Sequence, residues 1–366
     1  MASIQKRPDG AWRARYRDRS GKEHARHFRR KVDAQRWLDE SASELVTGLW
    51  ADPQLARGKL ETQAAAWLAS HPEWAPSTRA RNRSIVGLHI LPRWGGVRLG
   101  QITTEDVQKW VGELTVSAGS IRKITGVLSG IMEQAVATKY LAVNPVAAVA
   151  RPKQPMKRRR YLNAIEVERL ANCAGVHSDM ILTLAYCGLR FGEMAALHVS
   201  SVDTQRRRFM IEQSVTEVNG VLEWSAPKDH QRRSVPYPDF LADPIAARVN
   251  GHHGDRLVFP TPGGHAMRIG NARRDWFDPA VQAANLSPLT PHELRHTAAS
   301  LAVAAGASVL ALQRMLGHDK PSTTLDVYAD LFDEDLDRLA ERLATARSEA
   351  LADFLRTNDS PNNPQT

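Results

Sequence analysis

The spacing of apolar residues divides the chain into a short alternating segment, a helical middle segment and a long, mainly helical C-terminal segment. Residues 12–17 read Trp-Arg-Ala-Arg-Tyr-Arg, an alternation that is typical of a half-buried strand. Successive side chains of a strand point to opposite faces, so Arg13, Arg15 and Arg17 share one face. The turn signals Pro8-Asp9-Gly10 and Arg19-Ser20-Gly21 flank this strand and predict two hairpins.

The alternating segment is followed by a predicted helix from Lys31 to Val46, in which Ala34, Trp37, Leu38, Ala42 and Leu45 recur at helical spacing. Together these patterns predict a three-stranded sheet with one helix behind it and the arginine face in front. Such a face is either a solvent surface or a DNA contact. A sheet of this size fits the DNA major groove, so we favour DNA contact.

Residues 60–150 are predicted to form a bundle of four helices, at Leu60–Ser70, Ser77–Leu91, Thr104–Leu114 and Ser120–Lys139. Basic residues crowd the second and the fourth of these helices. We interpret them as a second DNA-binding face made of Arg79, Arg81, Arg83, Arg122 and Lys123.

The expected fold class is a mostly α, multidomain protein. A sheet-and-helix unit is expected over residues 1–55, a helical domain over 60–150, a basic linker over 151–160, a mainly helical domain with a small sheet over 161–345, and a tail over 346–366. The linker mixes proline with positive charge, which favours an extended chain. Its residues Arg158, Arg159 and Arg160 are expected to lie along a phosphate backbone.

Composition narrows the class of partner. The net charge of the 366 residues is +9, and residues 1–36 alone hold twelve Lys or Arg against four Asp or Glu. A positive charge concentrated in this way favours nucleic acid. The sequence has no apolar run long enough to span a membrane and no secretory signal, and its two cysteines lack metal-ligand spacing, so we expect a cytoplasmic protein that acts at the nucleoid.

Four short segments carry groups suited to breaking a phosphodiester, which needs cations on the phosphate oxygens, a nucleophile and a proton for the leaving oxygen. In the first, Gly188 ends an apolar helix and leaves Arg190 in a turn, where a guanidinium can hold a phosphate through two hydrogen bonds. Glu193 follows three residues later and can hold a neighbouring basic group. Alone, this segment fits a surface arginine better.

The second segment opens a helix, with Thr290 as N-cap, Pro291 in the first turn and Glu293 completing a capping box. His292 and Arg295 are three residues apart, so they project from one face at the positive end of this helix. A core histidine, or His296 as the important residue, are the alternatives.

The third and fourth segments supply a histidine and a tyrosine. Gly317 is expected to end a helix at 309–316 and to display His318 just beyond it. Ten residues later Tyr328 ends the run Thr-Thr-Leu-Asp-Val-Tyr. Taken singly, a surface histidine and a core tyrosine are the simpler interpretations.

Taken together and in this order, the segments Gly-Leu-Arg-Phe-Gly-Glu, His-Glu-Leu-Arg-His, Leu-Gly-His and Thr-Thr-Leu-Asp-Val-Tyr resemble the tyrosine recombinase (phage integrase) family. The resemblance covers residues 161–345 and extends to 60–160, and residues 1–55 look like its arm-type DNA-binding domain. It implies a transesterification without metal or other cofactor, through a 3′-phosphotyrosyl intermediate.

The resemblance also implies a role for each residue. Tyr328 would be the nucleophile, Arg190 and Arg295 would hold the phosphate, His292 would assist proton transfer at the tyrosine, and His318 would donate to the phosphate. Lys228 would protonate the leaving 5′-oxygen, with Glu193 in support. The family usually has threonine after this lysine, whereas this chain has Asp229, and His230 is the alternative donor.

The implied partners are double-stranded DNA at core-type and arm-type sites and three further copies of the chain, with a host DNA-bending protein and an excision factor as additional candidates. An amphipathic helix near Glu334–Leu351 either docks on a neighbouring protomer or packs on its own domain. The functional alternatives are a chromosome-dimer or plasmid-resolving recombinase, a type IB topoisomerase and a non-catalytic DNA-binding regulator.

Overall fold

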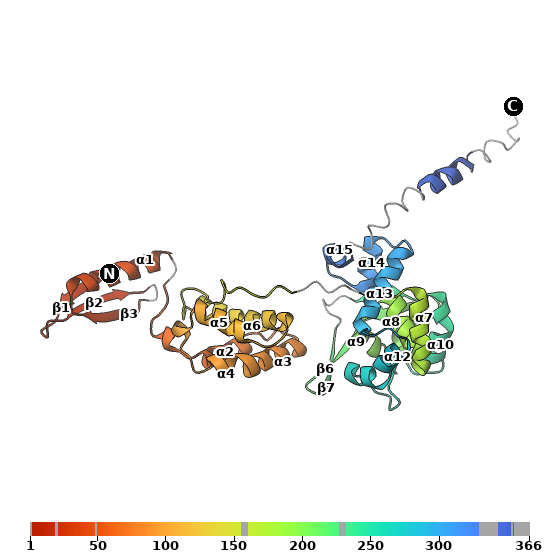
Figure 1. Ribbon diagram of the computed structural model, residues 1–366, viewed down its shortest axis with the longest axis horizontal. Coiled ribbons are helices and arrows are strands. Elements are labelled where there is room, and N and C mark those ends of the chain that lie inside the picture. The colour runs from red at the N-terminus through yellow and green to blue at the C-terminus, as the bar shows by residue number, and fades with distance from the viewer. Residues whose placement is uncertain are drawn as a thin grey trace. The chain divides into compact units, whose positions relative to one another are not determined.

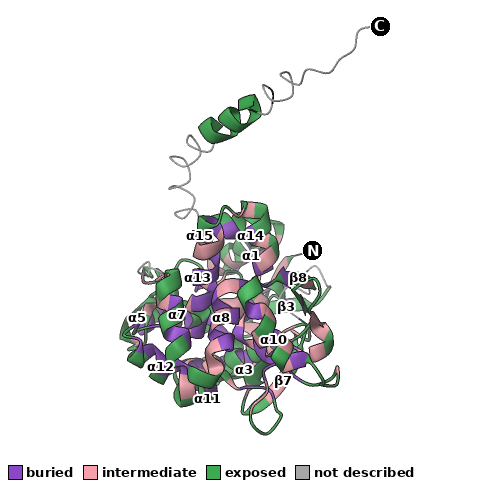
Figure 2. Cartoon of the chain, turned by 90° about the vertical axis from the view of Figure 1, so that its right-hand side faces the viewer, coloured by how far each residue is buried: buried purple, intermediate pink, exposed green. Residues whose placement is uncertain are grey.

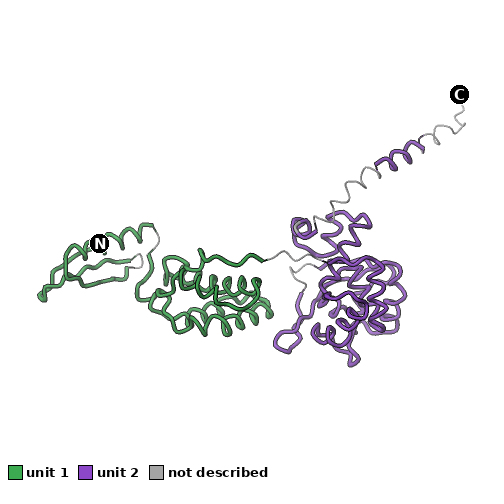
Figure 3. The backbone as a smooth tube through the Cα atoms, in the orientation of Figure 1, with its two compact units in different colours: residues 1–156 green, residues 157–366 purple. Residues whose placement is uncertain are grey.

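The computed structural model describes residues 2–18, 21–47, 50–154, 160–226, 232–328, 343–352 and 354. They belong to two compact units, residues 1–156 and 157–366, which are coloured separately in Figure 3 and are described one at a time below.

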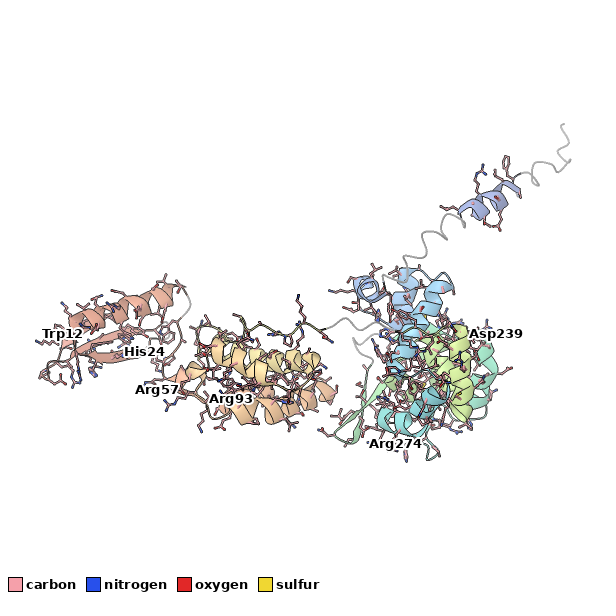
Figure 4. All side chains as sticks on the ribbon, viewed as in Figure 1. Trp12, His24, Arg57, Arg93, Asp239 and Arg274 are labelled. Atoms are coloured by element: carbon pink, nitrogen blue, oxygen red, sulfur yellow. The ribbon has the colours of Figure 1, made fainter. Side chains whose placement is uncertain are left out.

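The first unit opens with the predicted sheet and helix. The antiparallel strands β1 (Ser3–Lys6), β2 (Trp12–Arg17) and β3 (Glu23–Phe28) lie in the order β1-β2-β3, and α1 (Lys31–Thr47) follows them. Trp12 and His24 lie at opposite ends of the paired strands (Figure 4). Ala14 and Tyr16 are buried with side chains of α1, so the arginine face is the one turned away from the helix.

The rest of the first unit is the helical bundle expected from the periodicity. The helix predicted over residues 77–91 consists of a regular helix that ends at Ile85, a π-helical turn over 86–90 and a short helix that begins at Leu91. Pro92 lies in the first turn of this short helix, where the missing N–H costs least. The bundle is built from α2 (Leu60–Ala69), α3 (Pro76–Ile85), η2 (Val86–Ile90), α4 (Leu91–Trp94), α5 (Thr104–Glu113) and α6 (Ala118–Ala137), with short 3-10 turns η1 (Leu55–Arg57) and η3 (Leu99–Gln101).

The second unit is mainly helical, as the sequence predicts, and it contains two small sheets where one was predicted (Figure 1). Its helices are α7 (Ala164–Cys173), α8 (Ser178–Cys187), α9 (Phe191–Ala195), α10 (Ala242–Val249), α11 (Ile269–Ala272), α12 (Asp278–Ala283), α13 (Pro291–Ala304), α14 (Val309–Leu316) and α15 (Pro321–Tyr328). The shorter turns are η4 (Gly175–His177), η5 (Val199–Ser201), η7 (Asp239–Leu241) and η8 (Arg273–Phe277). One sheet has the order β4 (Val202–Asp203), β5 (Arg208–Ile211) and β8 (Arg233–Pro236), and β6 (Ser214–Val218) pairs with β7 (Val221–Ser225).

Helix α8 is the central element of this unit. It packs against α7 and α13, and most of its side chains are buried, as its purple colour in Figure 2 shows. An apolar helix of this kind is stable only when other elements cover it. Because α8 ends directly before Arg190, this packing fixes the position of the first segment with candidate chemistry.

The C-terminal part of the chain is described only in pieces. Residues 343–352 form a helix whose Leu343 and Leu351 are exposed. The first part of the helix predicted near Glu334–Leu351 lies outside the described residues. Residues 346–352 of the tail predicted over 346–366 are helical instead. Among the described helices, none combines the length and the apolar character that crossing a bilayer requires.

The stop at Gly188 yields a testable prediction. Gly188 has φ of 65°, and an added Cβ would lie 2.8 Å from Leu316 Cδ2 and 3.3 Å from Ala298 Cβ. Gly188→Ala is therefore expected to lower the free energy of unfolding of the C-terminal unit by about 1–3 kcal/mol. Chemical denaturation measures the change. Gly270→Ala in α11, where a Cβ would meet no atom within 4 Å, is the matched control and is expected to be near neutral. Equal stability of the two variants would contradict the prediction.

Candidate active site

Arg190 is placed by the turn between α8 and α9. It precedes α9, and the Glu193 carboxylate accepts the Arg190 backbone N–H at 2.8 Å, which caps the helix. The same carboxylate accepts the Arg190 side-chain Nη1 at 2.8 Å. Local sequence therefore fixes both the backbone and the guanidinium of Arg190, whose side chain is partly exposed.

Glu193 holds a second arginine from a distant strand. Arg233 of β8 donates Nη1 to Glu193 Oε1 at 3.0 Å and Nη2 to Oε2 at 2.6 Å. Burial raises the pKa of Glu193, but the hydrogen bonds and charge of Arg233, and then the charge of Arg190, outweigh it and lower the pKa to about 2. The carboxylate is thus ionised and shared between two guanidinium groups.

Arg295 of α13 is held by carbonyl groups at the ends of two helices. It donates Nη1 to Gly188 O at 2.6 Å and Nη2 to Leu316 O, and only 2% of its surface is exposed. Carbonyls at a helix C-terminus lack partners within their helix and carry partial negative charge. Burial, and then the charge of Arg190, lower the pKa of Arg295 to about 9, so this guanidinium remains charged at neutral pH.

The capping signals that the sequence predicts for α13 are confirmed: Glu293 accepts the Thr290 backbone N–H at 2.6 Å, and Pro291 begins the helix. His292 lies in the first turn and is exposed. Burial of part of the ring, followed by the charges of Arg295 and Arg190, lowers its pKa. His292 is thus a neighbour of both arginines.

Tyr328 ends α15 with its side chain only 1% exposed, packed among apolar residues of α13 and α14. Its hydroxyl lies 2.8 Å from His296 Nδ1. The ring of His318 lies parallel to the phenol, with the ring centroids 6.2 Å apart, and His318 Nδ1 lies 3.0 Å from Thr324 Oγ1. The positive-φ stop at Gly317, predicted from sequence, places His318 there.

The structure therefore brings five of the predicted residues into one region together with Glu193. Lys228, the sixth, and its alternative His230 lie outside the described residues. Sequence reasoning missed Arg233 and weighed His296 only as an alternative. The arginines at this site, Arg190, Arg233 and Arg295, outnumber the single carboxylate of Glu193 by two charges. This net positive charge favours the binding of a phosphate.

Sequence comparison identifies the class. Residues 154–335 match the Phage integrase family, and residues 60–151 match the Phage integrase central domain. The chain belongs to the phage integrase, or tyrosine recombinase, family. It is accordingly a DNA strand-exchange enzyme of the phage or mobile-element integrase type.

Named relatives agree with this assignment. A putative prophage phiRv2 integrase of Mycobacterium tuberculosis is 25% identical over 334 residues, which cover 86% of this chain and 88% of the relative. The tyrosine recombinase XerD of Haemophilus influenzae is 27% identical over 260 residues, which cover 65% of this chain and 81% of the relative.

Solved structures show the same fold. The Tn1549 transposon integrase in complex with a circular intermediate DNA matches with a TM-score of 0.66 at 20% identity, covering 77% of this chain and 99% of that one. A lambda integrase tetramer bound to a Holliday junction matches with a TM-score of 0.60 at 21% identity, covering 87% and 96%.

The arginine face of the recombinase's N-terminal sheet carries an internal counter-charge. Glu23 of β3 lies 3.3 Å from Arg13, 3.7 Å from Arg15 and 3.9 Å from Arg17, measured between side-chain nitrogen and oxygen atoms. These pairs are partly exposed, so each contributes little to stability. They do bring the three guanidinium groups, which follow one another along β2, close to one carboxylate.

The predicted basic face of the helical bundle is partly used by the fold itself. Arg81 and Lys123 line one hollow of about 270 Å³ between α3 and α6, and Arg83 and Arg122 are exposed. Arg79 instead donates Nη2 to the carbonyls of His71 and Pro72, at 3.2 and 3.1 Å.

Of the three linker arginines predicted to contact DNA, one is described by the structure. Arg160 donates Nη1 to Leu286 O at 2.9 Å and contacts Glu166, so its guanidinium binds groups of its own domain. Arg158 and Arg159 lie outside the described residues.

In the C-terminal unit, a mainly apolar cavity of about 880 Å³ lies beside the β6–β7 hairpin, and none of the predicted site residues lines it. No cluster of three or more His, Cys, Asp or Glu suited to a metal ion occurs among the described residues.

The shared Glu193 carboxylate predicts a pH dependence of stability. Because its pKa is lowered to about 2 in the folded protein, its contribution is complete above the pKa of the unfolded carboxyl, about 4.3, and is lost as the pH falls toward 2. Glu193→Gln is expected to destabilise the C-terminal unit by about 3–5 kcal/mol at pH 7, because Arg233 is left buried without its counter-charge. The free energy of unfolding of this variant is also expected to fall less steeply than that of the wild type as the pH is lowered (the acid limb of the stability curve).

Denaturant unfolding between pH 3 and pH 7 checks this expectation. Glu168→Gln on the exposed face of α7 is the matched control, and is expected to retain the wild-type stability and acid limb. An acid limb of the same steepness in Glu193→Gln and the wild type would show that another group causes it.

Proposed function

We propose that this recombinase integrates and excises a phage or other mobile element at specific attachment sites, with Tyr328 as the nucleophile. Tyr328 attacks the scissile phosphate and forms a 3′-phosphotyrosyl bond, freeing a 5′-hydroxyl. Arg190, Arg295 and His318 hold the phosphate oxygens as their charge develops. Lys228, or else His230, protonates the leaving oxygen. The phosphotyrosyl bond conserves the energy of the broken bond, so rejoining needs no external energy source.

One observation carries this proposal: residues from four separate segments converge around a tyrosine. The Arg190 turn, the first turns of α13, the end of α14 and the end of α15 are distant in sequence, yet Arg295 bonds Gly188 and Leu316, and His296 bonds Tyr328. A tyrosine that only filled a core would not need a buried arginine, a second, partly exposed arginine and two histidines close to it.

The two basic regions of the first unit supply the contacts to DNA in this proposal. The row of arginines Arg13, Arg15 and Arg17 enters the major groove at arm-type sites, and Arg81, Arg83, Arg122 and Lys123 contact core-type sites. Binding two sites with one chain raises the effective concentration of each contact. The N-terminal sheet favours an integrase over a chromosome-dimer resolving enzyme, which generally lacks such a unit.

The proposed assembly is a tetramer of this chain on two duplexes that exchanges strands in pairs through a Holliday junction. The lambda integrase tetramer bound to a Holliday junction, to which this fold is similar, supports that arrangement. A host DNA-bending protein and an excision factor are proposed as additional partners that decide between integration and excision. The site of action is proposed to be the bacterial nucleoid.

A suicide-substrate assay tests the proposed nucleophile. Nicked duplexes carrying a candidate attachment site are mixed with the protein, and covalent complexes are resolved on a denaturing gel. The wild type is expected to form a complex. Tyr328→Phe is expected to lose it entirely while binding the same DNA, because the attacking oxygen is gone.

The matched control is Tyr161→Phe, a second tyrosine that packs against the same apolar cluster, and it is expected to retain the complex. A covalent complex that persists in Tyr328→Phe would assign the nucleophile to another residue.

The C-terminal helix is proposed to dock on a neighbouring protomer and so to couple cleavage to assembly. Its Leu343 and Leu351 are 62% and 44% exposed, which is what an interface residue shows before it meets its partner. Deleting residues 333–366 is expected to abolish synapsis and recombination while leaving DNA binding intact.

Leu343→Asp with Leu351→Asp is the matched variant, since both side chains are exposed and the fold does not depend on them. Both variants are expected to lose paired-duplex complexes in gel-shift assays. Synapsis at the wild-type level in both would mean that the helix has no such role.

A further inference from the structure

The hydroxyl of Tyr328 has a protein partner that the family resemblance does not assign. His296 Nδ1 lies 2.8 Å from the Tyr328 hydroxyl, within hydrogen-bond distance. The phenol is buried among Ala299, Val303 and other apolar side chains, and the two rings lie 5.6 Å apart between centroids. A titratable group therefore lies within hydrogen-bond distance of the reactive oxygen.

The two histidines of α13 face different groups. Burial of part of the His292 ring, followed by the charges of Arg295 and Arg190, lowers the pKa of this histidine. The His292 and His296 rings are nearly perpendicular, at 80°, with centroids 4.9 Å apart. His292 is thus on the side of the phosphate-binding arginines, whereas His296 is on the side of the tyrosine.

The chemistry of the attack requires a group in the place of His296. A tyrosine hydroxyl ordinarily has a pKa of about 10, so at neutral pH it attacks as a phenol and must lose its proton on the way. A base within hydrogen-bond reach of that proton is the first requirement for general-base catalysis. A neutral imidazole whose Nδ1 accepts the hydroxyl proton meets it.

We propose that His296 is a catalytic base that accepts the proton of the Tyr328 hydroxyl during the attack on DNA. As the bond from Tyr328 Oη to phosphorus forms, the proton moves to His296 Nδ1, and the bond from phosphorus to the 5′-oxygen breaks. That oxygen takes a proton from Lys228 or its alternative. On rejoining, the 5′-hydroxyl gives its proton back to Lys228 or its alternative as its oxygen displaces the tyrosine, and His296 returns its proton to the phenolate oxygen.

This assignment rests on the proposed role of Tyr328 as nucleophile. It changes one role that the resemblance implies, because proton transfer at the tyrosine falls to His296 and His292 is left to contact the phosphate. It also explains why the segment carries histidine both before and after Leu294-Arg295.

The first test needs no DNA and therefore does not depend on the attachment site. Side-chain nitrogen NMR of the full chain with labelled histidine reports which ring nitrogen of His296 carries the proton. An unprotonated Nδ1 at neutral pH, with a resonance that shifts in Tyr328→Phe, is expected. A proton on Nδ1 of neutral His296 would overturn the proposal.

The second test separates proton acceptance from positioning. His296→Ala is expected to slow formation of the covalent complex at least about 100-fold, a loss typical of a missing general base, with DNA affinity unchanged. His296→Asn places an amide oxygen where Nδ1 was, which can accept the hydrogen bond but not the proton, and is expected to stay at least tenfold slow. A wild-type rate in either variant would overturn the proposal.

A substrate with sulfur in place of the leaving 5′-oxygen completes the test, because a thiolate departs without a proton. This substrate is expected to restore cleavage by Lys228→Ala but not by His296→Ala. Restoration of His296→Ala would place the residue at the leaving group and overturn the proposal. If wild-type protein and every variant fail to cleave any DNA, the proposed function itself fails, and the NMR result still decides the contact.

Discussion

The carboxylate of Glu193 is buried against the guanidinium groups of Arg190 and Arg233, and the rest of the active site is connected to it. Arg233 also donates Nε to Met315 O at 3.0 Å, at the end of α14. The next carbonyl, that of Leu316, accepts Arg295, which reaches Gly188 at the end of α8. One chain of hydrogen bonds therefore ties together the elements that present Arg190, Arg295 and His318.

This arrangement prepares the site for a phosphate before DNA arrives. Guanidinium groups that are fixed by carbonyls and by one carboxylate cannot collapse onto other anions, so their remaining positive charge is available to the substrate. The position of Arg233 in this network also explains why residue 317 is glycine. Its φ is 66°, and an added Cβ would lie 2.8 Å from Arg233 Cδ, so a side chain there would displace the arginine.

Local signals in the sequence predict much of this site, because they act over a few residues. The stop at Gly188, the cap formed by Thr290 and Glu293, and the display of His318 after Gly317 all depend on near neighbours. The fold class followed from periodicity for the same reason. The contact between Arg233 and Glu193 spans 40 residues and that between His296 and Tyr328 spans 32, so no local pattern reveals them.

The same limit applies to the basic residues. Arg160 bonds a carbonyl 126 residues away, and Arg79 bonds the loop before its own helix, so counting charges cannot tell these residues from those that remain exposed. Lys228 was placed by resemblance alone and lies outside the described residues, so its role stays a prediction.

The most direct test of the account is a crystal structure of the recombinase trapped covalently on nicked attachment-site DNA. The account predicts phosphorus bonded to Tyr328 Oη, with Arg190 and Arg295 donating to its non-bridging oxygens and Glu193 still bridging Arg190 and Arg233. A phosphate attached to another residue, or one that neither arginine contacts, would contradict it.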